Sequence, residues 1–343
     1  MKKNKTIMAM ILTMLIMVTQ INIVRADAYD KFSINPIIPE NQINQNVGYF
    51  DLDLKPNTKQ SLTIEIINQG DEPMNATVSL VDATTNNNAM KQFSTVKAPD
   101  ASLSTPLTSF ATLREEQIEV APHATENIYI DIDPTDVDFE GIRLGGITVI
   151  ADTLNNKDTS NASGVTLNNR VAYTLGLQTR MHDTPIKSNL NYVKTDIDVI
   201  DLDAHFVSVI QNDQPVLMNG VSLHGSISDT KTGKVVGMVD KKNGSIAPNT
   251  NFNVVYTGDR QTIDAGTYAI DLEIKHESDV WHFKDTFTVS EDASASINDD
   301  VVSFEQNANI LTWILLGIMG VMLMIIFFLL WKRHNDKENQ TSH

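Results

Sequence analysis

The sequence predicts an all-β chain that folds as two tandem β-sandwiches, with an N-terminal signal peptide and one C-terminal transmembrane helix. In the body of the chain, apolar and polar residues alternate with a period of two, and each such segment is short and flanked by Asn, Asp, Gly or Pro. Short alternating strands at regular spacing are typical of sandwiches. The first half of the body contains no convincing amphipathic helix. The chain also lacks cysteine, so we expect its core alone to stabilise it, without disulfides or thiolate metal sites.

Residues 1–28 are predicted to be a secretory signal peptide. A basic start, MKKNK, precedes the apolar run IMAMILTMLIMV, and the sequence ADA at residues 26–28 fits the small-residue rule for cleavage before Tyr29. The apolar run is too short to cross a bilayer as a mature helix. A retained signal anchor is the alternative interpretation.

The first sandwich is predicted at residues 29–160. Its opening part, residues 34–73, reads as a strand, a turn and another strand. Further strands are predicted at residues 61–68, 75–82, 126–133, 146–152 and 170–178.

The second sandwich is predicted at residues 164–290 and is expected to be immunoglobulin-like, as is the first. A hairpin at residues 229–236 turns at Thr232-Gly233. Further alternating segments lie at residues 204–212, 220–229, 234–240, 251–258, 266–276 and 281–290.

The boundary between the sandwiches has two possible positions. The polar segment 153–163 has the composition of a linker. If the strand at residues 170–178 instead closes the first sandwich, that sandwich extends to residue 182 and the hinge is HDTP at 182–185.

The C-terminal end predicts a membrane anchor. Residues 310–331 form an uncharged apolar run whose helix would be roughly 33 Å long, enough to span the hydrocarbon core. Trp313 and Trp331 lie near its ends, and KRH follows directly. Residues 291–309, expected to be a polar stalk, carry acidic residues and no Lys or Arg. The positive-inside rule therefore places the tail, 332–343, in the cytoplasm and the body on the cell-wall side of the membrane, as in a single-pass type I protein.

Composition and motifs exclude several functions. The formal net charge of −17 argues against nucleic acid as a partner, because phosphate binding needs clustered Lys and Arg. The histidines have no metal-ligand spacing, and no nucleophile motif is present, so we expect no cofactor and no enzymatic activity. Gly141, Gly145 and Gly146 predict a bulge or a close backbone approach.

The acidic run at residues 131–140, DIDPTDVDFE, could form a Ca²⁺ site or the carboxylate pair of a hydrolase, or it could simply be a solvated turn. Spaced carboxylates can bind Ca²⁺, but this run lacks the Gly and Glu positions of an EF-hand loop. Carboxylates beside a strand are more often a solvated turn. Asp131 and Asp133 could also serve as the carboxylate pair of a glycan hydrolase, which is the less favoured alternative for function.

The ordered set of motifs resembles the WxL-interacting proteins of Gram-positive bacteria. The likeness runs through FSINPIIPENQI (32–43), GYFDLDLKPNTKQSLTIEIIN (48–68), ATTNNNAM (83–90), FEGIRLGGITV (139–149), NNRVAYTLGLQTR (168–180), IAPNTNF (246–252), AGTYAIDLEI (265–274) and WHFKDTFTVS (281–290). The family often has Gly where this chain has Asn57. Because Asn tolerates the left-handed conformation, we expect that turn to survive.

The resemblance implies a non-catalytic adhesion adaptor. In that family, the first domain is regarded as binding peptidoglycan and the second as binding a host component. The partners that the resemblance implies are therefore peptidoglycan, WxL-domain surface proteins and host extracellular matrix. Candidate wall contacts are Gln42, Asn44, Tyr49 and Phe50, and adjacent strand residues face opposite ways, so at most one of the two aromatics points outward. Trp281 is the candidate partner contact. A membrane-tethered assembly chaperone for exported WxL proteins, which would offer a strand edge, is the alternative.

Overall fold

The computed structural model describes residues 32–94, 98–153, 171–258, 262–299 and 301, together with Leu316, Gly317, Met319 and Met324. The predicted signal peptide (1–28), the cytoplasmic tail (332–343) and all but those four residues of the predicted transmembrane helix (310–331) lie outside the described residues. The four described residues of that segment are helical. No helix within the described ranges is both long and apolar enough to cross a membrane.

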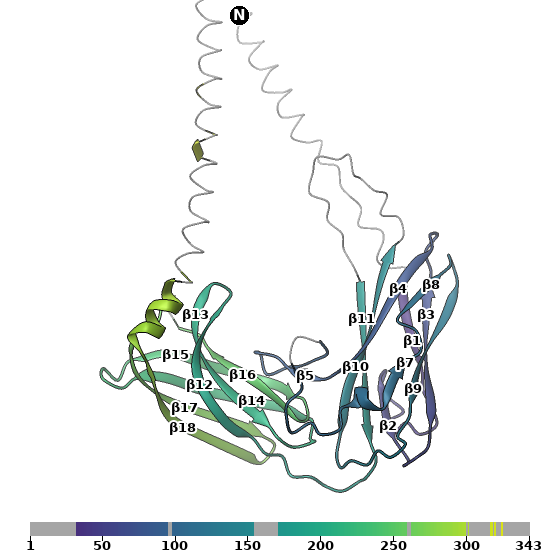
Figure 1. The fold of residues 1–343 in the computed structure, drawn as a ribbon, viewed down its shortest axis with the longest axis horizontal. Coiled ribbons are helices and arrows are strands. Elements are labelled where there is room, and N and C mark those ends of the chain that lie inside the picture. The colour runs from purple at the N-terminus through teal and green to yellow at the C-terminus, as the bar shows by residue number, and fades with distance from the viewer. Residues whose placement is uncertain are drawn as a thin grey trace, which may run out of the picture.

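The described body is all-β, as predicted, and forms two sandwiches that lie side by side (Figure 1). In the first sandwich, one sheet has the order β1-β3-β9-β7 and the other has the order β2-β11-β10-β4-β8. Their bounds are β1 Phe32–Ile37, β2 Phe50–Asp53, β3 Gln60–Asn68, β4 Met74–Asp82, β7 Ala111–Leu113, β8 Gln117–Val120, β9 Thr125–Ile132, β10 Arg143–Thr153 and β11 Val171–Arg180. A short 3₁₀ turn, η1 Leu107–Ser109, leads into β7.

The period-two pattern explains why these strands form this sandwich. In β3, Leu62, Ile64 and Ile66 are each at most 1% exposed, while the residues between them are half-buried. Ile147 and Val149 of β10 reach the same core from the opposite sheet. Each fully buried aliphatic side chain contributes roughly 1.5–3 kcal/mol of transfer free energy, so the alternation itself determines which face of each sheet turns inward.

The second sandwich pairs a sheet of order β12-β13-β16 with one of order β15-β14-β17-β18. The bounds are β12 Asn191–Ile200, β13 Asp203–Asn212, β14 Met218–Asp229, β15 Val235–Ile246, β16 Thr250–Tyr256, β17 Gly266–His276 and β18 Asp279–Val289. The predicted turn of the β14–β15 hairpin is present, with Gly233 at φ +69°.

The strand at the disputed boundary belongs to the first sandwich. β11 pairs antiparallel with β10 from Arg143↔Thr179 to Ala151↔Val171, and parallel with β2. Residues 181–190 then run to β12 without regular structure. This pairing favours the hinge at HDTP, residues 182–185, over a boundary near residue 161.

Two predicted backbone features are confirmed. Asn57 adopts φ +56°, the left-handed conformation expected of the residue that replaces Gly. A Cβ atom at Gly146 would lie 2.3 Å from the ring of Phe93, so only glycine allows this close approach. Asn57 supplies the left-handed residue of a turn, and Gly146 leaves the space that the ring of Phe93 occupies.

The segment expected to be a polar stalk begins instead as a docked helix, residues 291–299. Ser290 caps it by accepting a hydrogen bond from the backbone N–H of Ala293 at 3.1 Å. Asn298 donates to the carbonyl of Ile263 at 3.0 Å and accepts from the N–H of the same residue at 3.0 Å. Val301, 2% exposed, packs into the core of the second sandwich. Within this segment Ser294 and Asn298 bind the sandwich, while Glu291, Asp292, Ser296 and Asp299 are exposed.

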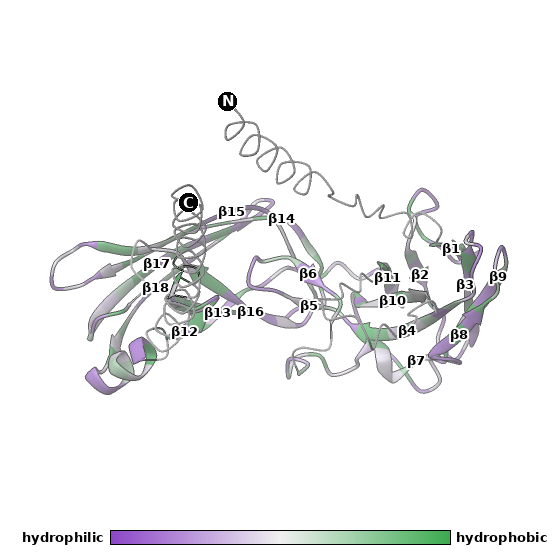
Figure 2. Ribbon diagram, turned by 90° about the horizontal axis from the view of Figure 1, so that it is seen from above, coloured by the Kyte–Doolittle hydropathy of each residue, from purple (hydrophilic) through white to green (hydrophobic). Residues whose placement is uncertain are grey.

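A small hairpin connects the two sandwiches. It consists of β5 (Thr84–Thr85), β6 (Lys91–Gln92) and the turn between them, and we call residues 84–92 the bridging hairpin. Seen from above, β5 and β6 lie between the sandwiches (Figure 2). Although the hairpin follows β4 of the first sandwich, Ala89 is 2% exposed and belongs to the core of the second.

Candidate functional site

Gln42, one of the four candidate wall contacts, organises its own loop. Its side-chain N–H₂ donates to the carbonyls of Asn44 and Tyr49 at 3.0 and 2.8 Å, and its oxygen accepts from the N–H of Asp51 at 2.9 Å. The residue is only 5% exposed. Because its polar atoms are already paired and shielded, the structure does not support Gln42 as a contact for a wall polymer.

The two adjacent aromatics face opposite ways. Phe50 is 0% exposed and lies in the core of the first sandwich, so it cannot reach a wall polymer. Tyr49 is 38% exposed, and its ring lies over Gly176 of β11. Asn44 is exposed, and its side chain accepts the N–H of Asn46 at 3.0 Å. Of the four candidates, Asn44 and Tyr49 remain accessible.

The sheet face next to Tyr49 carries small hydroxylated residues. Thr148 of β10 and Thr174 of β11 lie opposite each other and share a 2.9 Å hydrogen bond between their hydroxyls. On the same face, the paired residues Gly146 and Gly176 lie against Phe93 and Tyr49, so the two hydroxyls are close to aromatic side chains. Such a combination suits sugars, which present hydroxyls at their edges and C–H groups on their faces.

Trp281, the candidate partner contact, is half-buried on β18. It pairs with Ile274 of β17 and packs against the core of the second sandwich. It also borders a cavity of about 330 Å³ whose other lining residues include Lys187, Asn189 and Gln214. One part of the indole therefore stabilises the sandwich, while another faces the linker between the two sandwiches.

The acidic run 131–140 forms ion pairs. Asp131 is bound by the guanidinium of Arg114 at 2.7 Å, and Asp133 by the ammonium of Lys59 at 2.7 Å. Hydrogen bonds from these cations hold the pKa of both carboxyls below the ordinary value. A hydrolytic general acid needs a raised pKa, so the pair is poorly suited to glycan hydrolysis.

The run also does not gather into a metal site. Within the described ranges, no group of three or more His, Asp or Glu side chains is arranged to hold a metal ion. His182 instead lies 2.6 Å from Asp138, and that hydrogen bond raises the pKa of the imidazole. The contact between His182 and Asp138 lies at the hinge and stabilises the local structure there.

The bridging hairpin attaches to the second sandwich through paired polar groups. The Thr85 hydroxyl, 0% exposed, lies 2.9 Å from that of Thr250 and accepts the N–H of Ala247 at 2.9 Å. The N–H of Ser245 donates to the carbonyl of Ala89 at 2.8 Å, which extends the edge of β15. The hairpin thus fixes one sandwich against the other.

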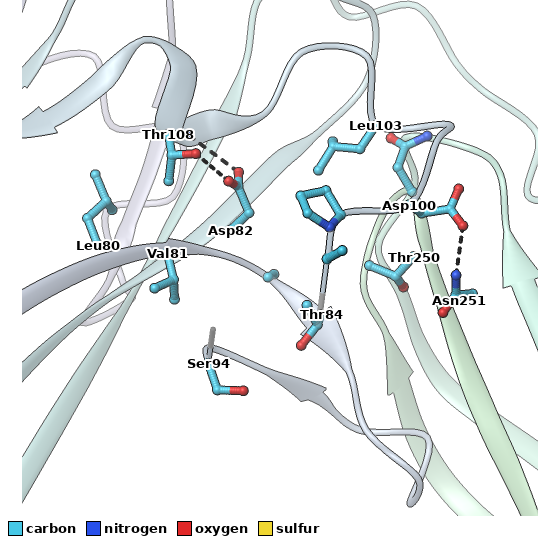
Figure 3. A pocket seen from close by; sticks show the side chains of 14 residues that line it. Leu80, Val81, Asp82, Thr84, Ser94, Asp100, Leu103, Thr108, Thr250 and Asn251 are labelled. Atoms are coloured by element: carbon cyan, nitrogen blue, oxygen red, sulfur yellow. Dashed lines mark hydrogen bonds between the residues drawn. The ribbon is translucent and has the colours of Figure 1, made fainter. Parts of the chain in front are cut away.

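A second set of contacts reinforces this junction. Asp100, in the loop after the hairpin, accepts from Gln211 at 2.9 Å and from Asn251 at 3.0 Å, both in the second sandwich. Nearby, Asn249 donates to the carbonyl of Ser102 at 3.2 Å. The carboxylate of Asp100 therefore holds the loop against β13 and β16, and Figure 3 shows its bond with Asn251.

A partly open cavity of about 380 Å³, which we call the junction cavity, lies at the junction (Figure 3). Its walls come from the end of β4, from β5, from the loop after the hairpin and from the start of β16. Sequence reasoning missed it, because the residues that line it lie far apart in the chain. The motif ATTNNNAM, which contains most of the hairpin, was the one signal that marked this region.

Two family models match the chain in sequence order. The peptidoglycan binding domain of WxL Interacting Protein matches residues 32–151, and its host binding domain matches residues 162–299. The chain belongs to the WxL-interacting protein family. The resemblance inferred from the ordered motifs is thereby confirmed, and both family domains are binding domains.

The domain limits of this WxL-interacting protein differ between family model and fold. The host binding domain model begins at residue 162, yet β11 completes a sheet of the first sandwich. The same model extends to residue 299, which includes the docked helix. The helix is therefore part of the second domain.

Solved structures similar to this WxL-interacting protein include two chaperones and a PapD-like domain. They include the YadV chaperone (10% identity, TM-score 0.32, 76% of this chain and 100% of that chain) and the E. coli chaperone DraB (12%, 0.30, 76% and 98%). The PapD-like domain of human CEP192 also matches, at 11% identity and TM-score 0.27, over 45% of this chain and 87% of that one. At these scores the likeness carries no argument about function. None of the curated proteins compared with the chain matches it.

Proposed function

We propose that this WxL-interacting protein is a non-catalytic adaptor of the cell surface. The first sandwich binds peptidoglycan, and the second presents a surface to a WxL-domain protein or to a host matrix component. The observation that carries the proposal is the match of both binding domains, in order, to two sandwiches joined by the bridging hairpin. A fixed junction suits an adaptor, because a load on one domain is transmitted to the other.

The proposal includes a location. The signal-like start and the apolar run at 310–331, followed by KRH, support a single-pass type I arrangement with the body on the cell-wall side. Anchoring many copies in one membrane would give avidity, so that weak single contacts with the wall suffice. The test is protease shaving of intact cells, which should remove the body but leave the tail protected.

We propose Tyr49, with the adjacent face formed by Thr148, Thr174 and Gly176, as the wall contact. The experiment is co-sedimentation of the full-length chain, in detergent, with peptidoglycan stripped of protein and teichoic polymer. The wild-type chain should pellet, and Tyr49→Ala should pellet less. Ile37→Ala is the matched control, because Ile37 is 44% exposed on β1 of the opposite sheet. A wild-type chain that stays in the supernatant would refute wall binding.

Assembly chaperone activity is the second candidate, and one feature favours it. β18 is an eleven-residue edge strand that pairs with β17, and its outer residues are largely exposed. Such an edge can accept a strand from another chain. A chaperone role predicts that the partner WxL protein is degraded or retained in cells lacking this chain. Normal export of the partner in such cells would refute the chaperone role and leave the adaptor role as the remaining proposal.

A further inference from the structure

The cavity of about 330 Å³ on the second sandwich, which we call the linker cavity, has the size of a ligand site. Small-molecule pockets typically measure roughly 300–1,000 Å³. The walls are residues 187–189 of the linker, Gln214 between β13 and β14, and residues 279–281 at the start of β18. The Ser188 hydroxyl donates to the carboxylate of Asp279 at 3.0 Å, which joins the linker to β18.

Two amide side chains of the linker cavity are held in a fixed orientation by Asp213. Asn189 donates to that carboxylate at 3.1 Å and Gln214 donates to it at 2.8 Å. Burial by itself would raise the pKa of Asp213, but hydrogen bonds from the neighbouring amides outweigh burial and lower the pKa, so the group is ionised and only accepts. An amide that points its N–H₂ group at Asp213 directs its oxygen elsewhere. Among the described residues, the side-chain oxygens of Asn189 and Gln214 are neither paired nor buried, so they can accept from a ligand.

The lining also supplies donors and an apolar surface. Lys187 is exposed, and within the described part of the chain its ammonium has no partner. The indole N–H of Trp281 is likewise unpaired there and is not buried. Val280, 46% exposed, adds an aliphatic surface beside the indole. The linker cavity therefore combines free acceptors, free donors and an aromatic ring.

This lining matches an uncharged sugar. Each hydroxyl of a sugar both donates and accepts, so a ring can meet the free oxygens of Asn189 and Gln214 and the N–H of Trp281 together. The C–H face of the ring then lies on the indole, whose apolar body and polar N–H suit such a ligand. The opposite charges of Lys187 and Asp279 cancel, and the net charge of −17 on the whole chain repels anions. We propose that the linker cavity binds a short, uncharged stretch of a glycan.

This proposal goes beyond the proposed function, because it names a ligand class for the second sandwich. Neutral sugars at a bacterial surface come from host glycans and from the wall's own glycan strands. All lining residues fall within the segment that matches the host binding domain, residues 162–299, which favours the host source. That choice of source rests on the proposed function, whereas the site depends on neither source.

The experiment is titration of the full-length chain, in a detergent without a sugar head group, with three disaccharides. N-acetyllactosamine is the probe for host glycans, chitobiose is the probe for the wall's glycan backbone, and a sulfated heparin disaccharide is the charged comparison. We expect saturable binding of a neutral disaccharide by calorimetry and no binding of the sulfated one. The same titration should change the fluorescence of Trp281, and Trp281→Phe should abolish that change.

Lys187→Met is the decisive variant. Methionine keeps an unbranched apolar stem and removes the ammonium, and because Lys187 is exposed, the unfolding midpoint should not change. Affinity for the neutral disaccharide should fall about tenfold, the effect of one lost hydrogen bond to the ligand. Lys231→Met is the matched control, because Lys231 is exposed in the turn at the opposite end of β14 from Gln214. The control should change neither property.

Equal affinity of the wild type and Lys187→Met for the neutral disaccharides would overturn the linker cavity as the site, as would calorimetric binding without a change in Trp281 fluorescence. Tighter binding of the sulfated disaccharide than of either neutral one would overturn the ligand class. A preference for N-acetyllactosamine supports the host source, and a preference for chitobiose supports the wall source, with the site intact in both cases. If no disaccharide binds, this inference fails, while co-sedimentation with whole peptidoglycan tests the adaptor function separately.

Discussion

Replacing Thr85 by valine tests whether the bridging hairpin stabilises the second sandwich. Thr85 lies in the first half of the chain and is 0% exposed, with its hydroxyl between Thr250 and the N–H of Ala247. Valine has nearly the same volume, so the substitution leaves no cavity. The change therefore isolates the hydrogen bonds that join the two sandwiches.

The expected loss of unfolding free energy follows from the groups left behind. The N–H of Ala247 becomes a buried donor without a partner, which costs about 1–3 kcal/mol. Thr250 loses one contact but still donates to the carbonyl of Ala247 at 2.9 Å, so it adds little. We expect a loss of about 2 kcal/mol. With an m-value of about 2 kcal/mol per molar urea, the unfolding midpoint would fall by roughly 1 M.

The assay is urea unfolding followed by tryptophan fluorescence. Trp281, on β18, reports on the second sandwich, and the remaining tryptophans, Trp313 and Trp331, lie in the predicted membrane helix. Thr84→Val is the matched control, because the neighbouring Thr84 hydroxyl has no partner among the described residues and its removal should not lower the midpoint. An unchanged midpoint for Thr85→Val would refute the coupling between hairpin and second sandwich.

Three further predictions concern single residues. Phe50→Ala should lower the unfolding free energy by about 3–5 kcal/mol, because the ring is fully buried, whereas Tyr49→Ala should leave it nearly unchanged; urea unfolding of both variants checks this. Asn57→Gly should be tolerated, while Asn57→Ala should cost about 1 kcal/mol at φ +56°, and thermal unfolding that ranks alanine equal to glycine would contradict this. The pKa of Asp100 is lowered from 3.8, so its contribution to stability is present above that value and is lost as the pH falls through the lower folded pKa. Acid titration should therefore show a smaller loss of stability for Asp100→Asn than for the wild type, and equal losses would contradict the assignment.

Structure that depends on residues close together in the sequence was predictable, and structure that depends on distant residues was not. The strands were predictable because alternation is local, and β3 shows it in Leu62, Ile64 and Ile66. The left-handed turn at Asn57 was predictable for the same reason, since it depends on one backbone angle. The docked helix at 291–299 was missed, although Ser290 and the acidic residues after it form a recognisable start of a helix.

The candidate site was only partly predictable. Adjacent residues on a strand point to opposite faces, so one of Tyr49 and Phe50 had to be buried, but the sequence could not say which. The sequence also could not show that the Gln42 side chain forms its hydrogen bonds within its own loop. The partners of Gln42 are backbone atoms, which only the folded turn brings into place.

The sequence by itself determined the all-β class and the membership of the family, because period-two alternation and ordered motifs are visible in the linear order of the residues. Only the tertiary structure decided that β11 completes the first sandwich and that residues 84–92 enter the second. It also decided that Thr84, Asp100 and Asn249 surround one cavity. These outcomes depend on contacts between residues up to about 165 positions apart, as in the Thr85–Thr250 pair. No local pattern records such pairings, because their free energy comes from burial and hydrogen bonding that exist only after the two sandwiches meet.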